Sequence, residues 1–274
     1  MNLATHRALV TGGAGGIGMA IAAALLERGA AVLLADRDPS GLAAAAGQFR
    51  SAGDRLGSFA GDLTLAADRA RLVQQAASWR GGIDVLVNNA GINPFGLLQD
   101  QTAAQVELSF AVNAQAPIQL CRELLPHLRS LPAAHIVNMG SVFGSIGFPG
   151  YAVYSATKFA MRGFSEALGR ELADTGVRVH CLAPRATRTR INSPEVERMN
   201  AELGVAMDDP AVVGAALCAV LGQGNSFSVV GWPEKLFARV NAVLPRLVDG
   251  ALRKQLPIIR RYAAPKSPAA GETP

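Results

Sequence analysis

Short apolar runs alternate with longer amphipathic stretches along most of the chain. Seven of the short runs predict buried β-strands, and they span Ala8–Thr11, Ala31–Ala35, Arg55–Phe59, Asp84–Val87, His135–Met139, Val177–Leu182 and Phe227–Val230. The longer stretches repeat their apolar residues at helical spacing, and they predict helices over Gly16–Arg28, Ser40–Arg50, Leu65–Trp79, Thr102–Arg129, Tyr151–Asp174 and Ala211–Leu221. Strands and helices that alternate in this order are typical of an α/β fold, with a parallel sheet and helices on both of its faces.

A different pattern begins after the seventh strand. Large apolar residues recur there at helical spacing and define one face of a helix; they are Phe237, Val240, Leu244, Leu247, Val248, Ala251, Leu252 and Ile259. Basic residues recur every seven positions on the opposite side, at Arg239, Arg246, Arg253 and Arg260. Pro245 and Pro257 predict breaks that divide the segment into two or three short helices. We therefore expect a folded domain over residues 1–230, a basic amphipathic helical extension over 231–262, and a disordered tail over 263–274.

The net charge of +5 is confined to this C-terminal segment. Residues 231–274 carry eight Lys or Arg and three Asp or Glu, whereas residues 1–230 carry 18 of each sign. Large apolar residues opposite basic ones suit a helix at a membrane interface, or a lid over a long hydrophobic substrate. An ordinary packing helix with a solvated face, or a contact between subunits, explains the same pattern. The neutral body has no basic patch interleaved with aromatic residues, which argues against nucleic acid as a partner.

The cysteines and the lengths of the apolar runs bear on the compartment. Cys121, Cys181 and Cys218 lie far apart in apolar surroundings and without metal-ligand spacing, which predicts buried free thiols in a reducing cytoplasm and no metal site. No apolar run approaches the roughly 18 residues of a membrane span, and no charged and apolar leader precedes the first strand. We expect a cytoplasmic protein, associated with the cytoplasmic face of a membrane only if the C-terminal helices bind lipid.

A glycine-rich loop joins the first strand to the first helix. Its sequence, Thr11-Gly-Gly-Ala-Gly-Gly-Ile-Gly18, contains Gly13-x-Gly15-x-x-Gly18 in the strand–turn–helix context that a dinucleotide site requires. Glycines let the backbone approach a pyrophosphate, whose charge the helix N-terminus stabilises. The loop therefore predicts a Rossmann-like fold, a doubly wound sheet of seven parallel strands that binds a dinucleotide. A glycine-rich turn without a ligand is the alternative.

Asp36 ends the second strand, in Leu33-Leu-Ala-Asp-Arg-Asp38. A carboxylate at this place can accept hydrogen bonds from a ribose diol and repels a 2′-phosphate, so it favours NAD over NADP. Arg37 has the opposite effect, because a guanidinium can pair with a 2′-phosphate. Asp36 also suits a cap of the following helix, although Asp38 or Ser40 can fill that role. NAD is the predicted cofactor, and NADP remains open.

Three side chains have the chemistry to move a proton on and off an alcohol oxygen. Tyr154 and Lys158 lie one helical turn apart, and Ser141 follows the fifth strand. A phenol with a pKa of about 10 is a poor base at neutral pH, but an ammonium on the same helix face stabilises the phenolate. Tyr154 would exchange the proton, and Ser141 would hold the substrate oxygen. The alternative without function is a half-buried aromatic residue beside a lysine that extends to solvent.

Together these motifs resemble the short-chain dehydrogenase/reductase family, of the single-domain type, over about residues 3–231. The markers are Thr11-Gly12-x-x-x-Gly16-x-Gly18, Asp62, Asn88-Asn-Ala-Gly91, Asn113, Ser141, Tyr154 and Lys158. The resemblance implies that Asp62 meets the adenine, that Asn88 to Gly91 line the cofactor cleft, and that Asn113 supports the lysine through water. It also implies a homodimer or homotetramer, formed through the helices predicted over Thr102–Arg129 and Tyr151–Asp174.

The resemblance assigns the site residues to domain 1–230. The catalytic residues are expected to be Asn113, Ser141, Tyr154 and Lys158. The residues expected to bind the cofactor are Gly12, Gly15, Gly16, Ile17, Gly18, Asp36, Arg37, Asp62, Leu63, Asn89, Ala90, Gly91, Tyr154, Lys158, Pro184, Thr187 and Thr189. Lys158 is expected to bind the nicotinamide ribose, and Thr189 the carboxamide.

The chain departs from the family pattern after the sixth strand. Ala183-Pro-Arg-Ala-Thr-Arg-Thr189 has Arg185 where the family usually has glycine after the proline. We interpret Arg185 as a solvated surface residue, with contact to a carboxylate or phosphate of the substrate as the alternative.

Apolar residues around the proton-moving set predict the substrate class. Residues 142–150 and 190–209 offer Phe143, Ile146, Phe148, Ile191, Met199, Leu203, Val205 and Met207, and Tyr151 is expected in the pocket wall. Such a lining favours a hydrophobic secondary alcohol or ketone, lipid-like or polycyclic. The sequence therefore predicts an NAD(P)-dependent oxidoreductase that acts on CH–OH groups. The alternative is a sensor or scaffold that binds the dinucleotide without turnover.

Overall fold

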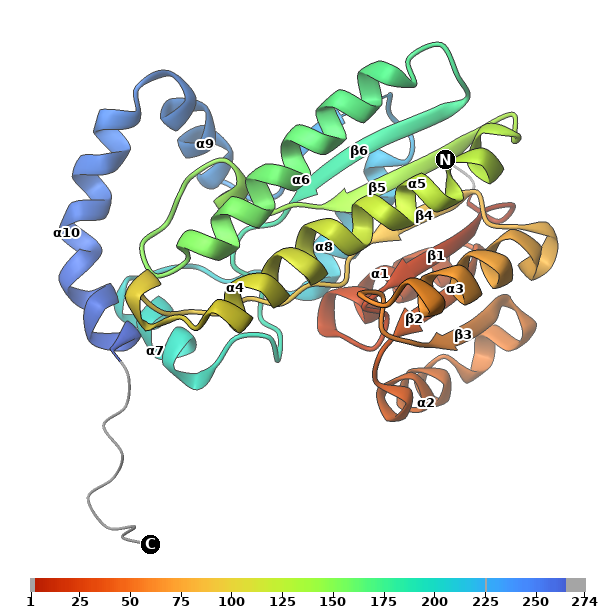
Figure 1. The fold of residues 1–274 in the computed structure, drawn as a ribbon, viewed down its shortest axis with the longest axis horizontal. Helices are drawn as coiled ribbons and strands as arrows, with labels where there is room; N and C mark the ends of the chain where they lie inside the picture. Colours follow the sequence, from red (N-terminus) through yellow and green to blue (C-terminus); the bar gives the residue numbers. More distant parts are fainter. Residues whose placement is uncertain (1–2, 225, 265–274) are drawn as a thin grey trace, which may run out of the picture.

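The computed structural model describes residues 3–224 and 226–264. Seven parallel strands form one sheet in the order β3-β2-β1-β4-β5-β6-β7 (Figure 1). The strands are β1 (Arg7–Thr11), β2 (Ala31–Asp36), β3 (Leu56–Ala60), β4 (Val85–Asn88), β5 (Ala134–Met139), β6 (Val177–Ala183) and β7 (Ser226–Val229). Each end lies within one residue of its predicted position, and the predicted α/β class and parallel sheet are confirmed.

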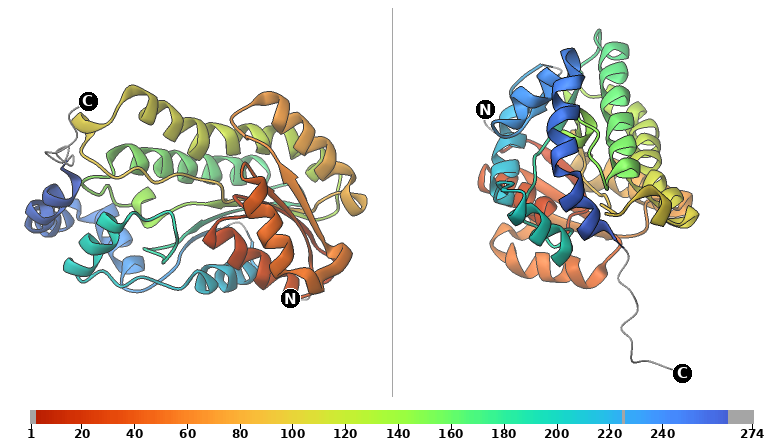
Figure 2. Two further views of the ribbon diagram at one scale, coloured as in Figure 1. Left: turned by 90° about the horizontal axis from the view of Figure 1, so that it is seen from below. Right: turned by 90° about the vertical axis from the view of Figure 1, so that its left-hand side faces the viewer.

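Helices cover both faces of the sheet (Figure 2). One face carries α1 (Gly16–Glu27), α2 (Pro39–Gln48) and α8 (Pro210–Val220). The other face carries α3 (Ala66–Ser78), α5 (Ala116–Arg129) and α6 (Ala152–Glu171). The doubly wound arrangement predicted from the glycine-rich loop is therefore present. Short 3₁₀ helices lie in the connections: η1 (Arg50–Arg55), η2 (Trp79–Gly81), η3 (Leu98–Asp100) and η5 (Val142–Gly144).

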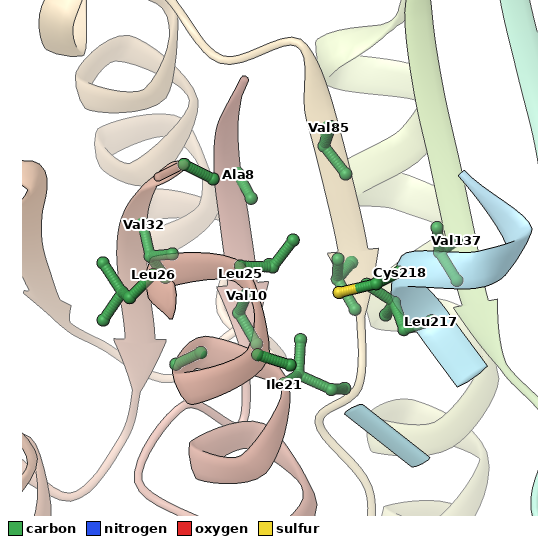
Figure 3. Packing of buried hydrophobic residues seen from close by; sticks show 14 of the residues in the cluster. Ala8, Val10, Ile21, Leu25, Leu26, Val32, Val85, Val137, Leu217 and Cys218 are labelled. Carbon is green, nitrogen blue, oxygen red and sulfur yellow. The ribbon is translucent and has the colours of Figure 1, made fainter. Parts of the chain in front are cut away.

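The core consists of two apolar layers, one on each face of the sheet. Neighbouring residues of a strand point to opposite faces, so a strand covered on both faces is apolar throughout. Val10 of β1 packs with Ile21 of α1 and Leu217 of α8 (Figure 3). Its neighbour Leu9 packs with Leu124 of α5 on the other face. The cysteines Cys121, Cys181 and Cys218 are free and buried, as predicted.

The helix predicted over Thr102–Arg129 contains an irregular turn. It consists of α4 (Ala103–Phe110), a π-helical turn η4 (Ala111–Gln115), and α5. Apolar periodicity does not reveal the extra residue of such a turn, because the helix continues in the same direction on both sides. Turns of this kind occur frequently at functional sites, and this one contains Asn113.

One helix of the substrate region was not predicted. α7 (Pro194–Glu202) begins after Ser193, whose hydroxyl accepts a hydrogen bond from the backbone N–H of Val196. Ser193 followed by Pro194 is a recognised helix-start signal, because serine caps the first turn and proline fits its first position. That signal would have identified α7.

The C-terminal extension forms two helices, α9 (Glu234–Val243) and α10 (Pro245–Ala263). They lie beyond the end of the sheet toward which the strands point (Figure 1). The predicted break at Pro245 is confirmed, but the one at Pro257 is wrong, because Pro257 lies within α10. Pro257 is exposed, while Val248 and Ile259 are buried and hold the helix on both sides of it. None of the helices in residues 3–224 and 226–264 is both long and apolar enough to cross a membrane.

The predicted disordered tail starts too early. Ala263 is the last residue of α10 and is buried, because this end of the helix packs against the rest of the chain. Residues 265–274 of the predicted tail lie outside the described residues.

Candidate active site

A cleft of about 920 Å³ opens at the carboxyl ends of the strands. This edge is where doubly wound sheets bind ligands, and the volume is in the range of small-molecule sites. All the residues that were expected to bind the cofactor line the cleft, from Gly12 in the loop after β1 to Thr189 after β6, whereas Asn88, which was expected in the cleft wall, does not. Ser141 also lines it, whereas Asn113 does not.

Glycines of the loop after β1 leave no room for side chains. A Cβ atom on Gly18 would lie 2.1 Å from the carbonyl oxygen of Gly12, and one on Gly16 would lie 2.9 Å from Cγ2 of Thr189. Gly12 has a φ of +64°, a conformation that side chains disfavour. Gly15 precedes α1 and provides no side-chain cap, so the N–H groups of the first turn remain accessible to an anion. The loop therefore fits the pyrophosphate of a dinucleotide.

Hydrogen bonds fix Asp36 at the rim of the cleft. Its Oδ2 accepts from the backbone N–H of Ala14 at 3.0 Å, and its Oδ1 accepts from that of Asp38 at 3.1 Å. Asp38, not Asp36, caps α2 by accepting from the backbone N–H of Ser40. The capping alternative for Asp36 is therefore wrong. The carboxylate of Asp36 is held beside Arg37 in the cleft lining.

The loop after β3 contributes Asp62 and Leu63 to the same lining. Oδ1 of Asp62 accepts hydrogen bonds from the backbone N–H and the hydroxyl of Thr64. The loop after β4 is tied to β1, because Oγ1 of Thr11 accepts from the backbone N–H groups of Asn89 and Ala90. Strands distant in the sequence are thus joined directly beneath the cleft.

Ser141, Tyr154 and Lys158 meet in the middle of the cleft. Lys158 is buried, and its Nζ donates to the carbonyl of Met139 at 2.9 Å and lies 5.6 Å from the ring centre of Tyr154. Burial lowers the pKa of Lys158 to about 8, and the nearby Cys181 acts in the opposite direction, raising that pKa. Burial raises the pKa of Tyr154 to about 12, and a hydrogen bond with Ser141 opposes this rise. At neutral pH the set therefore holds a protonated phenol beside an ammonium.

Asn113 lies behind the cleft, in the π-helical turn η4. Its amide oxygen accepts from the backbone N–H of Ile92 at 2.8 Å, and its amide nitrogen donates to the carbonyl of Ile92 and to Oγ1 of Thr157. A Cβ atom on Gly91 would lie 3.2 Å from Oδ1 of Asn113 and 3.8 Å from Nζ of Lys158. Asn113 thus holds the loop after β4 against the catalytic helix. Its support of Lys158 through water remains a prediction.

Asn88 was expected to line the cofactor cleft together with the next three residues, and this expectation is wrong for Asn88. Its side chain is buried and donates to Oδ1 of Asn138 at 2.8 Å. Asn88 is the last residue of β4, and successive side chains of a strand point to opposite faces of the sheet. The side chain of Asn88 points into the layer of α5 and α6, where Asn138 donates a hydrogen bond to Ser165.

Arg185 is not the solvated surface residue that the sequence predicted. Its side chain is 17% exposed, and its Nη2 lies 2.5 Å from Oδ1 of Asp208. Its Nη1 lies 3.4 Å from Oε2 of Glu234 and donates to the carbonyl of Trp232. The hydrogen bond with Asp208, together with Glu234, raises the pKa of Arg185 above its ordinary value. Arg185 thus joins the loop after β6 to the start of α9.

Replacing Arg185 by Met is expected to lower the free energy of unfolding by about 2–4 kcal/mol, because two partly buried carboxylates lose their shared counter-charge. Urea denaturation measures this change. The matched control is Arg170→Met, since Arg170 forms an exposed ion pair with Glu166 and its loss should cost less than about 1 kcal/mol. Equal destabilisation by the two substitutions would contradict the joining role of Arg185.

The other half of the cleft is apolar. Of the eight residues predicted for this lining, Phe143, Ile146, Phe148, Ile191, Met199 and Val205 are present, whereas Leu203 and Met207 are not. Tyr151 lies in the wall, as expected, and its pKa is raised by burial. Leu203 packs into the cluster around α7, and the sulfur of Met207 faces the amide of Asn200, because the loop curls back on α7.

The C-terminal extension covers this apolar half. Side chains of both helices line the cleft, among them Phe237, Val240, Leu247, Val248, Ala251 and Leu252. Val248 packs with Val142 and Ile146, and the amide of Asn241 donates to the carbonyl of Ser145 at 2.8 Å. The apolar inner face of the extension therefore matches the predicted lid over the cleft.

Val196 and Asn93 also line the cleft, and no sequence motif had identified them.

A glycine-rich dinucleotide cradle, a Ser–Tyr–Lys set and an adjoining apolar chamber together define an oxidoreductase that acts on CH–OH groups with a nicotinamide dinucleotide. The chain belongs to the short-chain dehydrogenase family, since the model of that family, described as short chain dehydrogenase, matches residues 6–200. Within residues 3–224 and 226–264, no three His, Cys, Asp or Glu side chains gather into a group that could hold a metal ion.

Curated relatives and solved structures agree with this family. Nodulation protein G of Rhizobium sp. (strain N33) is 34% identical over 233 residues, which cover 84% of this chain and 94% of that protein. Ketoacyl reductase HetN of Nostoc sp. is 33% identical over 252 residues, with 89% and 87% covered. The structure of a 3-ketoacyl-(acyl-carrier-protein) reductase from Brucella melitensis complexed with NADH has a TM-score of 0.74 at 28% identity, with 80% of this chain and 91% of that chain covered. A short-chain dehydrogenase from Streptomyces avermitilis has a TM-score of 0.77 at 27% identity, with 93% and 98% covered.

Proposed function

We propose that this enzyme interconverts a hydrophobic secondary alcohol and the corresponding ketone, with NAD as its preferred cofactor and Tyr154 as general acid and base. The observation that carries the proposal is the position of Tyr154. Its ring packs against the apolar cluster that contains Tyr151 and lies 5.6 Å from Nζ of Lys158, and its hydroxyl forms a hydrogen bond with Ser141. A ketoacyl reductase among the relatives is in keeping with a lipid-like substrate.

The residues of the set divide the work on the substrate oxygen. A bound nicotinamide dinucleotide would supply or accept the hydride. The hydroxyl groups of Ser141 and Tyr154 hold the oxygen, and the phenol that is protonated at neutral pH donates its proton to a ketone. In the reverse direction the ammonium of Lys158 stabilises the phenolate, so that Tyr154 can accept the alcohol proton. Asp36 would hold the adenine ribose, and the loop Gly12–Gly18 the pyrophosphate.

NADH is expected to bind at least about tenfold more tightly than NADPH, because the fixed carboxylate of Asp36 repels a 2′-phosphate. Fluorescence titration gives both dissociation constants. Asp36→Asn is expected to reduce the ratio toward one. Asp38→Asn is the matched control, since Asp38 caps α2 and does not line the cleft, and it should leave the ratio unchanged. Tighter binding of NADPH by the wild type would overturn the preference.

The apolar chamber is expected to make turnover rise with the length of the substrate. Each buried methylene contributes about 0.8 kcal/mol, so kcat/KM should grow about fourfold per methylene until the chamber is filled. Absorbance at 340 nm measures NADH formation from secondary alcohols and 3-hydroxyacyl thioesters of graded length. Activity confined to short or polar alcohols would contradict a hydrophobic substrate. Absence of turnover with NAD and NADP on all of them would favour the alternative of a dinucleotide-binding sensor.

We also propose a homo-oligomer, formed through α4 and α6. These helices contact one another, and each exposes a phenylalanine, Phe110 at 40% and Phe159 at 44%. Exposed aromatic residues on neighbouring helices are typical of interfaces. Light scattering of the purified protein tests this proposal, and a monomer would contradict it.

A further inference from the structure

Six large apolar side chains are exposed to solvent on the α9–α10 hairpin, including that of Trp232, which lies just before α9. They form what we name the hairpin patch: Trp232, Leu236, Phe237, Val243, Leu244 and Leu247. Their exposed fractions range from 46% for Leu236 to 77% for Val243. Single exposed apolar residues are ordinary on protein surfaces, but six of them between residues 232 and 247 of one hairpin indicate a contact surface. The hairpin stands at one end of the molecule, where a flat partner can reach it (Figures 1 and 2).

The hairpin patch is continuous with the mouth of the cleft. Phe237 and Leu247 belong to the patch and also line the cleft. Deeper in the same wall, Val240, Val248 and Leu252 continue the apolar path to the chamber beside Tyr154. Apolar side chains therefore line one wall of the cleft from the hairpin patch to the chamber beside Tyr154.

The helices that carry the hairpin patch are basic. Residues 231–264 contain seven Lys or Arg and two Asp or Glu, and Glu234 is already paired with Arg185. Lys235, Arg239, Arg246 and Arg253 are exposed along the same two helices. A second copy of this chain would bring these charges together and be repelled. Exposed apolar side chains on basic helices match the anionic surface of a lipid bilayer, in which the cations meet headgroups and the apolar side chains enter the acyl boundary.

We propose that the hairpin patch docks on an anionic lipid bilayer, and that the enzyme exchanges its substrate directly with that bilayer. The second part rests on the proposed function, since it needs a hydrophobic alcohol or ketone. The docking itself does not, because it follows from the exposure and charge of the hairpin alone.

Vesicle co-sedimentation of the full-length protein tests the docking. We expect binding to vesicles with 30% phosphatidylglycerol in phosphatidylcholine, and at least about tenfold weaker binding to phosphatidylcholine alone, since each cation near the surface contributes about fivefold. The double variant Val243→Asp/Leu244→Asp should lose at least about tenfold in vesicle affinity. Neither residue lines the cleft, so turnover of a short, soluble alcohol should stay unchanged. Leu65→Asp is the matched control, because Leu65 is 55% exposed at the start of α3, and it should bind vesicles like the wild type.

Three results would overturn the docking: no binding of the wild type to anionic vesicles, equal binding by the double variant, or a change of oligomeric state in the double variant. The last result would make the hairpin patch a contact between copies of this chain. Exchange of substrate with the bilayer is tested separately, by turnover of a long-chain alcohol dissolved in the vesicles. The double variant should lose that turnover while it keeps activity on the short alcohol, and equal loss of both activities would contradict the exchange.

Discussion

Replacing Tyr154 by Phe is expected to lower kcat by about 10²- to 10⁴-fold, the usual contribution of a positioned general acid or base. The substitution removes one hydroxyl, and with it both the proton and the hydrogen bond to Ser141. The ring and its contact with Lys158 remain, so the dissociation constant for NADH should change by less than about threefold. Steady-state kinetics and a fluorescence titration separate the two effects.

The neighbouring Tyr151 provides the matched control for this experiment. It lies three residues before Tyr154, lines the same cleft and is more deeply buried. Because its hydroxyl is not part of the Ser–Tyr–Lys set, Tyr151→Phe should keep kcat within about tenfold of the wild type. If Tyr154→Phe retained more than a few per cent of the turnover, or if Tyr151→Phe lost as much, the assignment of the general acid would be wrong.

Acidification from pH 7 to pH 4 is expected to destabilise the fold by several kcal/mol through two buried histidines. Nδ1 of His135 on β5 lies 3.1 Å from Nε2 of His180 on β6, and both side chains are buried. Burial lowers the pKa of His135 to about 4 and that of His180 to about 4, and the nearby cation Arg178 acts in the same direction. His6 and Asp84 also face His135; His6 lowers its pKa, whereas the carboxylate raises it.

The direction of this change in stability follows from the pKa values of the two histidines in the folded and the unfolded chain. In the unfolded chain each histidine has a pKa of about 6.5, so between pH 6.5 and 4 the unfolded state binds more protons than the folded one, and stability falls as the pH falls. The contribution of the two neutral histidines to stability is fully present above about pH 7, and it is lost as the pH falls to about 4. A depression of this size corresponds to about 3 kcal/mol for one histidine. Repulsion between the two charges in the folded state lowers the pKa of the second histidine further, so the coupling adds to the loss.

Urea denaturation at a series of pH values measures this loss. The double variant His135→Gln/His180→Gln removes both titrating groups, so its stability should change much less between pH 7 and pH 4.5. The informative quantity is the slope of the unfolding free energy against pH, because a constant destabilisation by the substitutions does not change that slope. An unchanged slope in the double variant would show that other groups cause the acid sensitivity. Asp84 acts at lower pH, because hydrogen bonds from His6 and the backbone of Arg7 outweigh its burial and lower its pKa.

Much of the cofactor half of the site could be predicted from the sequence, because its determinants are local. Gly12 and Gly18 lie six residues apart in one loop, and the carboxyl end of β1 fixes where that loop stands. Tyr154 and Lys158 share a helix face by their spacing alone. Asp36 follows from its position at the end of β2. In each case the backbone geometry of a few consecutive residues decides which atoms can face a ligand.

The substrate half could be predicted only in its apolar character. Arg185 has the spacing of a surface residue, and its carboxylate partners lie 23 and 49 residues further along the chain. Pro257 should end a helix by its local chemistry, yet packing on both sides of it holds α10 together. The π-helical turn at Asn113 has no periodic signal, because it alters the helix by one residue.

The sequence by itself therefore determined the parallel sheet, its strand bounds, the dinucleotide loop and the proton-moving set, since hydrophobic periodicity and glycine conformation act over a few residues. Only the tertiary structure decided that α9 and α10 cover the apolar half of the cleft, that Arg185 joins them to the loop after β6, and which of their side chains remain in solvent. These features depend on contacts between segments far apart in the chain. Such contacts are selected by the total burial of apolar surface and the pairing of charges in the folded molecule, and no short stretch of the sequence contains them.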